Sequence, residues 1–325
     1  MTNSLEPKDI PVGVVGLGLM GSSIVVALLI AGHPVKAIAP LAEDIELGPL
    51  RIKEQLNECN KCGLLSRSVE SYILQLTVTE DYSLLENCQF VLECVVESME
   101  VKKVVYQKIS SATSKDCIIA TNTSAIPITF LQQLVTYPER FMGVHWAEPA
   151  YMTRFLEITC GNQTSLQKAE WMFSLAIHWK KEPTILRKDI RGFVTNRLMY
   201  AIYREALQMI HSGETTIEDA DKSFHYDAGS WMTLMGVFKR MDFMGLDDFN
   251  EFFKNIFPKL NNDDRVPEIM QTMVNKKAKG IKSAQGLYNY TQEEAKNWEE
   301  NFALFNKDIY ELAAKYPFDI LEEQA

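Results

Sequence analysis

Long apolar runs and a surplus of basic residues are both missing from this sequence of 325 residues. The longest apolar run, 24–31, has eight residues, whereas a membrane-spanning helix needs about 20. Acidic residues outnumber basic ones by 43 to 33, and nucleic-acid binding needs a concentrated basic face to contact the phosphates. We therefore expect neither a membrane span nor a nucleic-acid partner.

Cysteine is also scarce, with six residues in the whole chain, and the N-terminal segment has acids but no apolar stretch. This combination favours reduced thiols and a cytoplasmic location over a disulfide framework. Cys59 and Cys62 have the spacing of half a zinc site, but no second Cys or His pair follows, so no metal site is predicted. The remaining composition, 46% hydrophobic and 23% charged, is typical of a globular protein.

Short β-branched segments alternate with helical patterns from residue 12 to about residue 187, which is typical of a mostly parallel sheet with crossover helices. The predicted strands are 12–15, 35–39, 76–79, 90–95, 117–121, 141–145, 155–159 and 184–186. Beyond Gly192 the pattern turns helical, beginning with 194–211. We predict an α/β domain over residues 1–187 and an all-α domain over residues 188–325.

A glycine-rich turn follows the first predicted strand and opens an apolar helix over 22–31. Gly16 permits the tight turn, Gly18 lets the backbone approach a pyrophosphate, and Gly21 lets the helix pack closely. The helix N-terminus offers N–H groups and its positive dipole end to phosphates. A structural glycine turn is the alternative to this dinucleotide site. The predicted cofactor residues here are Gly16, Gly18, Leu19, Met20 and Gly21.

The second predicted strand lacks the terminal acid that holds the adenosine ribose in most dinucleotide sites. Ala39 stands at that place, and the first acids are Glu43 and Asp44. Three alternatives stay open: one of these acids turns back to the ribose, the adenosine end is held weakly, or the cofactor preference is unusual. No arginine follows directly to bind a 2′-phosphate, so NAD is predicted rather than NADP.

A histidine and a glutamate lie on consecutive predicted strands. His145 ends one strand, and Glu157 lies inside the next. Strands joined by a short loop can bring such residues together, where the imidazole takes an alcohol proton and the carboxylate stabilises the imidazolium. On spacing alone, a purely structural pair is the stronger interpretation.

Five linked motifs surround these residues. They read GLGLMG at 16–21, ATNTS at 120–124, GVHWAEP at 143–149, LEI at 156–158 and GFVTNRL at 192–198. In order and spacing they resemble the L-3-hydroxyacyl-CoA dehydrogenase family, which includes the 3-hydroxybutyryl-CoA dehydrogenases of fatty acid metabolism. The resemblance continues through 91–102, 235–247 and 280–288, so it covers nearly the whole chain.

The resemblance implies a Rossmann-like domain followed by a helical domain that forms homodimers, with NAD as cofactor and an acyl-CoA as the small-molecule substrate. It also implies that His145 is the general acid and base, that Glu157 orients it, and that Ser124 and Asn196 hold the 3-oxygen of the substrate. The cofactor-side residues that it implies are Glu97, Lys102 and Asn122. For Glu97 and Lys102, a helix-start acid and a solvated lysine are the structural alternatives.

Two departures from the family pattern concern the substrate. Glu148 stands where the family usually has asparagine, and a carboxylate close to His145 would raise the histidine pKa and repel a substrate carboxylate. The segment 229–236 is more similar to the gulonate and carnitine dehydrogenase branch, which acts without CoA. A CoA substrate would need cations, and ordinary surface residues are the alternative for those available. The candidates are Arg51, Lys53, Lys61 and Arg67.

Three functions therefore stay open. The first is NAD-dependent interconversion of an L-3-hydroxyacyl-CoA and its 3-oxoacyl-CoA, which retention of Ser124, His145, Glu157 and Asn196 favours. The second is a dehydrogenase of a small 3-hydroxy acid without CoA, which 229–236 favours and Glu148 disfavours. The third is a non-catalytic binding or structural protein on the same fold, as the resemblance to lambda-crystallin allows.

Overall fold

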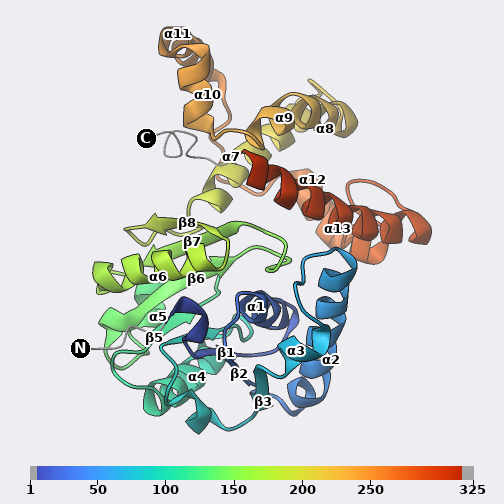
Figure 1. The fold of residues 1–325 in the computed structure, drawn as a ribbon. Helices are drawn as coiled ribbons and strands as arrows, with labels where there is room; N and C mark the ends of the chain where they lie inside the picture. Colours follow the sequence, from blue (N-terminus) through green and yellow to red (C-terminus); the bar gives the residue numbers. More distant parts are fainter. Residues whose placement is uncertain (1–5, 317–325) are drawn as a thin grey trace. The chain divides into compact units, whose positions relative to one another are not determined.

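The computed structural model describes residues 6–316 and divides the chain into two units, one ending at Val194 and the other beginning at Thr195 (Figure 1). Residues 1–5, which form part of the N-terminal segment considered above, and residues 317–325 lie outside the described residues. Each unit has its own architecture and its own pattern of burial.

An eight-stranded sheet forms the centre of the first unit, in the order β3-β2-β1-β4-β5-β6-β7-β8. The strands are β1 (Val12–Val15), β2 (Val35–Ile38), β3 (Leu76–Thr79), β4 (Phe90–Glu93), β5 (Ile118–Thr121), β6 (Phe141–Trp146), β7 (Phe155–Cys160) and β8 (Glu182–Leu186). Every neighbouring pair is parallel except β6 and β7. The mostly parallel sheet that the β-branched segments predict is therefore confirmed.

Helices cover both faces of this sheet (Figure 1). Their bounds are α1 (Leu19–Ile30), α2 (Ala42–Lys61), α3 (Val69–Ile73), α4 (Met99–Ala112), α5 (Ile128–Gln132) and α6 (Leu166–His178). Side chains of α1, α2, α3 and α6 join one hydrophobic cluster, and those of α4 and α5 join the other. Because helices cover both faces, the central strands are buried on both sides, which explains their continuous apolar sequences.

The strand order changes direction at β1, which lies between β2 and β4. In open α/β sheets such a point leaves a crevice at the carboxyl ends of the strands, where ligands bind. The glycine-rich turn follows β1, and Glu93 ends β4. The topology therefore brings the predicted cofactor turn and the end of β4 to the same edge of the sheet.

The first unit continues past 187 to Val194 because the connecting segment packs against the sheet domain. Thr129 N donates a hydrogen bond of 2.7 Å to Asp189 Oδ2, and Phe193 is buried in a hydrophobic cluster of this unit. Val194 N donates to Glu157 Oε2 at 3.3 Å. These contacts attach the segment to α5 and β7.

The second unit is helical. It comprises α7 (Thr195–His211), α8 (Ile217–Tyr226), α9 (Ala228–Met232), α10 (Val237–Met244), α11 (Leu246–Ile256), α12 (Glu268–Asn275) and α13 (Gln292–Lys315), with short 3-10 turns at Phe257–Lys259 and Ile281–Ser283. Thr216 caps α8, and Thr291 forms a capping box with Glu294 at the start of α13. The all-α second domain that the sequence predicts is confirmed.

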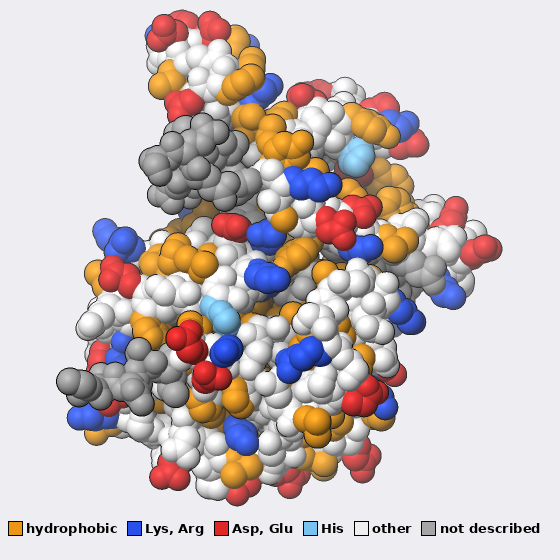
Figure 2. All heavy atoms as spheres, viewed as in Figure 1, with side chains coloured by type: hydrophobic (Ala, Val, Ile, Leu, Met, Phe, Trp, Pro, Cys, Tyr) orange, Lys and Arg blue, Asp and Glu red, His pale blue; other side chains and the backbone are white. Residues whose placement is uncertain are grey.

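The surface of the molecule carries both charged and apolar side chains. On the face drawn in Figure 2, Lys and Arg side chains are interspersed with acidic ones, and apolar side chains lie on the surface of the second unit. None of the helices between residues 6 and 316 combines the length and the hydrophobicity needed to cross a membrane. All six cysteines are free thiols.

Candidate active site

The glycine-rich turn excludes side chains at two positions and leaves open space at the third. Gly16 has a φ of 97°, and a Cβ there would lie 2.9 Å from the carbonyl oxygen of Cys94. A Cβ at Gly21 would lie 1.9 Å from the carbonyl oxygen of Gly16. A Cβ at Gly18, which precedes α1, would meet nothing within 4 Å. The turn thus offers open backbone at a helix N-terminus, as a pyrophosphate needs.

The start of α2 returns to this turn through Asp44. Its carboxylate accepts a hydrogen bond of 3.4 Å from Leu17 N, and Arg51 Nη1 donates to the Leu17 carbonyl at 2.9 Å. Arg51 also donates to Asp44 Oδ1 at 3.4 Å. Of the two acids that follow Ala39, Asp44 therefore faces the glycine-rich turn, whereas Glu43 is exposed.

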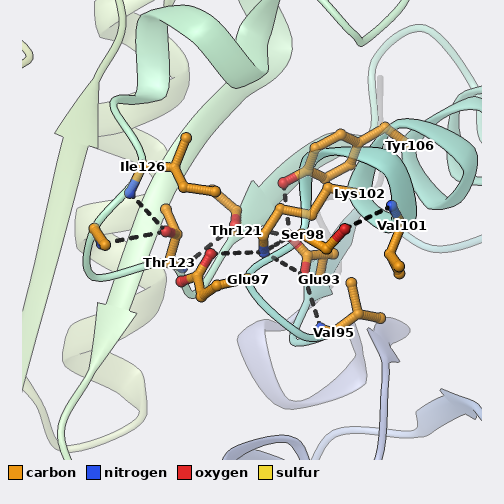
Figure 3. Close-up of polar contacts among 11 residues, drawn as sticks. Glu93, Val95, Glu97, Ser98, Val101, Lys102, Tyr106, Thr121, Thr123 and Ile126 are labelled. Carbon is orange, nitrogen blue, oxygen red and sulfur yellow. Dashed lines mark hydrogen bonds and ion pairs between the residues drawn. The ribbon is translucent and has the colours of Figure 1, made fainter.

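A buried carboxylate, that of Glu93, lies at the end of β4 (Figure 3). Glu93 accepts hydrogen bonds from Lys102 Nζ at 2.8 and 2.9 Å, from the Tyr106 hydroxyl at 2.6 Å and from Thr121 Oγ1 at 2.8 Å. Lys102 Nζ also lies 3.5 Å from Glu97 Oε2, and the two side chains are 1% and 43% exposed. Lys102 therefore links a buried carboxylate to an accessible one.

Sequence reasoning identified Glu97 and Lys102 but missed Glu93, Tyr106 and Thr121. The sequence did contain an indication of this cluster. Glu93 is an acid inside an apolar strand, and a buried carboxylate needs a charged or hydrogen-bonding partner. Burial, together with the charge of Glu93, raises the pKa of Tyr106 well above its usual value, so its hydroxyl keeps the proton that it donates.

The loop after β5 is fixed at its base and exposed at its tip. Asn122 N donates to the Glu93 carbonyl at 2.9 Å, and Asn122 Oδ1 accepts from Trp146 N at 2.9 Å. The side-chain oxygen of Asn122 is thus bonded to β6, on the opposite side of the loop from β4. Ser124 lies two residues further on and is exposed. Its hydroxyl is accessible to a ligand.

His145 and Glu157 are directly opposite each other in the antiparallel ladder of β6 and β7. Side chains of opposite residues lie on the same face of a sheet, with Cβ atoms about 5 Å apart. The rings of Phe155 and Phe193 pack 5.6 and 5.9 Å from the imidazole. His145 Nδ1 is buried and has no hydrogen-bond partner within the described part of the chain.

The electrostatic environment keeps His145 neutral near pH 7. Burial lowers its pKa below the usual 6.5, and the charge of Glu97 partly opposes this shift. Glu148, which the sequence offered as a neighbouring charge, is exposed in the following loop. The charge that raises the pKa of His145 is that of Glu97, in the loop after β4.

Comparison with known proteins identifies both units. Residues 11–190 match the NAD-binding domain of 3-hydroxyacyl-CoA dehydrogenase, and residues 192–290 match the C-terminal domain of the same enzyme. The chain belongs to the 3-hydroxyacyl-CoA dehydrogenase family. It is thus an enzyme of an NAD-dependent family, and the resemblance stated from its motifs is confirmed.

Individual members of this dehydrogenase family differ in substrate. A 5-formyl-3-hydroxy-2-methylpyridine 4-carboxylate 5-dehydrogenase from Mesorhizobium japonicum is 30% identical over 88% of this chain and 92% of its own. A probable 3-hydroxybutyryl-CoA dehydrogenase from Deinococcus radiodurans is 28% identical over 86% of this chain and 99% of its own. A crystal structure of a 5-dehydrogenase of the same pyridine compound, described as an NAD+-dependent dismutase, has a TM-score of 0.85 at 28% identity and covers 94% of this chain and 98% of its own.

The cations predicted to contact CoA fall into two groups in this dehydrogenase. Arg51 is bonded to the glycine-rich turn, as described above. Arg67 donates to Gln75 Oε1 at 3.0 Å, and its guanidinium lies 4.5 Å from the centre of the Tyr72 ring. Lys53 and Lys61 are exposed on α2.

Asn196 stands apart from the other predicted catalytic residues because it belongs to the second unit, where it is the second residue of α7. Ser124, His145 and Glu157 all belong to the first unit. The role of Asn196 toward the substrate oxygen therefore stays a prediction from the family pattern.

Proposed function

We propose that this dehydrogenase interconverts a hydroxyl and a carbonyl group on its substrate, with His145 as the acid and base. The turn at 16–21, together with Glu97, Lys102 and Asn122, would hold NAD, which would supply the hydride chemistry when bound. The observation that carries the proposal is a half-buried imidazole whose buried Nδ1 has no partner within the described residues and which lies directly opposite a carboxylate.

In the oxidation direction, His145 accepts the proton of the substrate hydroxyl, and in reduction it returns that proton. Glu157, which lies opposite His145 in the ladder, stabilises the imidazolium through its negative charge. Hydrogen bonds at a catalytic pair often tighten only when the substrate binds. Ser124 and Asn196 hold the oxygen whose charge changes during the reaction.

We propose a substrate without CoA as the first candidate. Two of the four cations considered for CoA, Arg51 and Arg67, already have partners within the protein. The Mesorhizobium relative, whose name describes a pyridine carboxylate as substrate, supports a small acid of this kind. The second candidate is an L-3-hydroxyacyl-CoA, which the exposed Lys53 and Lys61 and the Deinococcus relative support.

The substrate classes can be separated by following NADH oxidation with acetoacetate, acetoacetyl-pantetheine and acetoacetyl-CoA, with NADPH in parallel. Equal activity on the two thioesters would mean that the nucleotide part of CoA is not recognised. A strong preference for acetoacetyl-CoA that is lost in Lys53→Ala/Lys61→Ala would favour the second candidate. Small aromatic hydroxy acids and aldehydes complete the panel, as the Mesorhizobium relative suggests.

The role of His145 predicts a large effect on turnover. Replacing His145 by Asn is expected to lower kcat by about 100-fold to 10,000-fold, the usual contribution of a general acid or base. Binding of NADH, measured by fluorescence, is expected to persist. His225→Asn, which changes an exposed histidine of α8, is the matched control. Unchanged turnover in His145→Asn would contradict the mechanism.

We further propose that the second unit pairs with a second copy of the chain. Helices α7 to α12 bury no side chain, and Phe238 and Phe243 of α10 are 76% and 73% exposed. Large apolar side chains on adjacent turns of a helix are typical of a surface that another element covers. Sedimentation equilibrium is expected to give a dimer, and Phe238→Glu/Phe243→Glu is expected to weaken it. An unchanged monomer in both proteins would exclude this pairing.

A further inference from the structure

One buried carboxylate at the end of β4 collects hydrogen bonds from three separate elements (Figure 3). Glu93 Oε1 accepts from Val95 N at 2.7 Å and from Lys102 Nζ at 2.8 Å. Its Oε2 accepts from Lys102 Nζ, from the Tyr106 hydroxyl and from Thr121 Oγ1. The side chain is fully buried. These contacts come from the loop after β4, from α4 and from β5.

All the groups around this side chain are donors. An ionised carboxylate accepts at both oxygens, whereas a glutamine would turn an NH2 group toward some of these donors. Lys102 is almost fully buried, so its ammonium group would be left without a buried counter-charge if Glu93 were neutral. The chemistry of the cluster therefore requires a negative charge at position 93.

Two loops of the proposed active site are hydrogen-bonded to this carboxylate near their starts. Val95 opens the loop that carries Glu97, and Thr121 opens the loop that carries Ser124. Thr121 Oγ1 also accepts from Thr123 N at 3.3 Å. A single buried group thus fixes the base of the cofactor-side loop and of the substrate-side loop.

Lys102 lies between two carboxylates, with Glu93 on the buried side and Glu97 on the accessible side. Because Glu93 neutralises the ammonium group, Glu97 is drawn to Lys102 only by the longer contact and keeps its negative field. The negative charge of Glu97 raises the pKa of His145. The other carboxylate that faces His145 is that of Glu157, opposite it on β7.

We propose that Glu93 is a positioning residue of the active site, which neutralises Lys102 and so keeps that lysine from drawing Glu97 toward itself. The proposal rests on the proposed role of His145 as the acid and base. Glu93 itself touches neither substrate nor cofactor. Its effect on the reaction passes through Lys102 and Glu97.

The test is an NMR titration of His145 in the full-length protein labelled with 13C at the histidine ring, which needs no substrate and no turnover. The chain has five histidines, and His145→Asn assigns the resonance. In Glu97→Gln, the pKa of His145 is expected to fall by roughly half a pH unit, as loss of one nearby charge predicts. Glu93→Gln is expected to lower it as well, because Lys102 then draws Glu97 toward itself.

The double variant Glu93→Gln/Glu97→Gln is expected to show no further fall beyond that of Glu97→Gln alone, since the effect passes through Glu97. A direct field of Glu93 on His145 would give additive falls and would overturn the proposal. Tyr82→Phe is the matched control, because Tyr82 lies near Glu93 but its buried hydroxyl has no partner within the described residues. It is expected to leave the titration unchanged.

If Glu93→Gln does not fold, Glu93→Gln/Lys102→Met removes the buried cation together with the anion. Its expected pKa for His145 is that of the wild type, because nothing then draws Glu97 away. A pKa as low as that of Glu97→Gln would overturn the proposal. Absence of turnover on every substrate, with the titrations behaving as expected, would contradict the proposed reaction but not the positioning role.

Discussion

The two units of this dehydrogenase differ most in what they bury. The sheet unit encloses two hydrophobic clusters whose members are almost all inaccessible to solvent, including nearly the whole of α1. In the second unit, Ala295 is the one described residue that is buried. A parallel sheet covered on both faces completes its own core, whereas amphipathic helices need a further surface to cover their apolar sides.

The proposed active-site residues and the proposed pairing surface lie on different sides of this contrast. The glycine-rich turn, Glu93 and the pair His145 and Glu157 all belong to the unit with the closed core. A preorganised site needs side chains that are held in place by packing, and the packed core of the sheet unit provides them. Asn196 is the one predicted catalytic residue outside it.

The helical unit is expected not to be stable on its own, whereas the sheet unit is. A fragment of residues 6–194 is expected to unfold cooperatively and to bind NADH, because its core is complete. A fragment of residues 195–316 is expected to show no cooperative transition as a monomer, since it buries too little apolar surface to offset its conformational entropy. Circular dichroism during heating and NADH fluorescence measure the two properties. A sharp transition in a monomeric helical fragment would contradict the comparison.

A pair of matched leucine substitutions tests the same difference in burial. Leu28 of α1 is fully buried, and Leu304 of α13 is 60% exposed. Leu28→Ala is expected to lower the free energy of unfolding by about 2–5 kcal/mol through the cavity that it leaves. Leu304→Ala, in dilute monomeric protein, is expected to change it by less than about 0.5 kcal/mol. Denaturant titration measures both. Equal losses would contradict the difference in burial between the two units.

A further expected effect is a pH dependence of stability that arises in the sheet unit. His33 is fully buried, where Ile10 O pairs with its Nδ1 at 2.9 Å and Trp179 Nε1 donates to its Nε2 at 2.7 Å. Burial lowers the pKa of His33 to about 4. Below pH 6.5, His33 binds a proton in the unfolded chain but not in the folded protein. Stability is therefore lost as the pH falls from 6.5 toward 4.

This linkage amounts to about 2 kcal/mol of lost stability by pH 5. The free energy of unfolding of the wild type between pH 7 and pH 5 measures it. In His33→Gln, which cannot titrate there, the loss over the same interval is expected to be smaller by that amount. Identical slopes in the two proteins would exclude His33 as the cause.

Much of the fold and part of the site followed from local sequence. All eight strands lie within two residues of their predicted bounds, because β-branched runs and crossover helices mark a buried parallel sheet. The glycine-rich turn could also be predicted from the sequence, because a Cβ at Gly16 or Gly21 would clash with backbone atoms. The prediction that His145 could meet Glu157 agrees with the ladder, where the two residues are opposite.

Other features had no local signal. Arg51, a candidate phosphate contact, is bonded to the Leu17 carbonyl. The segment from 188 to 194 joins the first unit through Asp189 and Phe193, although its charges and glycine show no periodicity. In each case the partner is distant in the sequence, so no pattern of spacing could reveal it.

The strands, the helices after residues 16–21 and after Gly192, and the family could be read from sequence alone, because they depend on side-chain periodicity, on glycine where backbone atoms come close and on motif order. Which charges meet depends on the three-dimensional fold. Glu93, Lys102 and Thr121 come from β4, α4 and β5, and they form one cluster because the parallel sheet gathers the ends of its strands at one edge. Burial then makes their pairing obligatory, since a charge removed from water needs a partner.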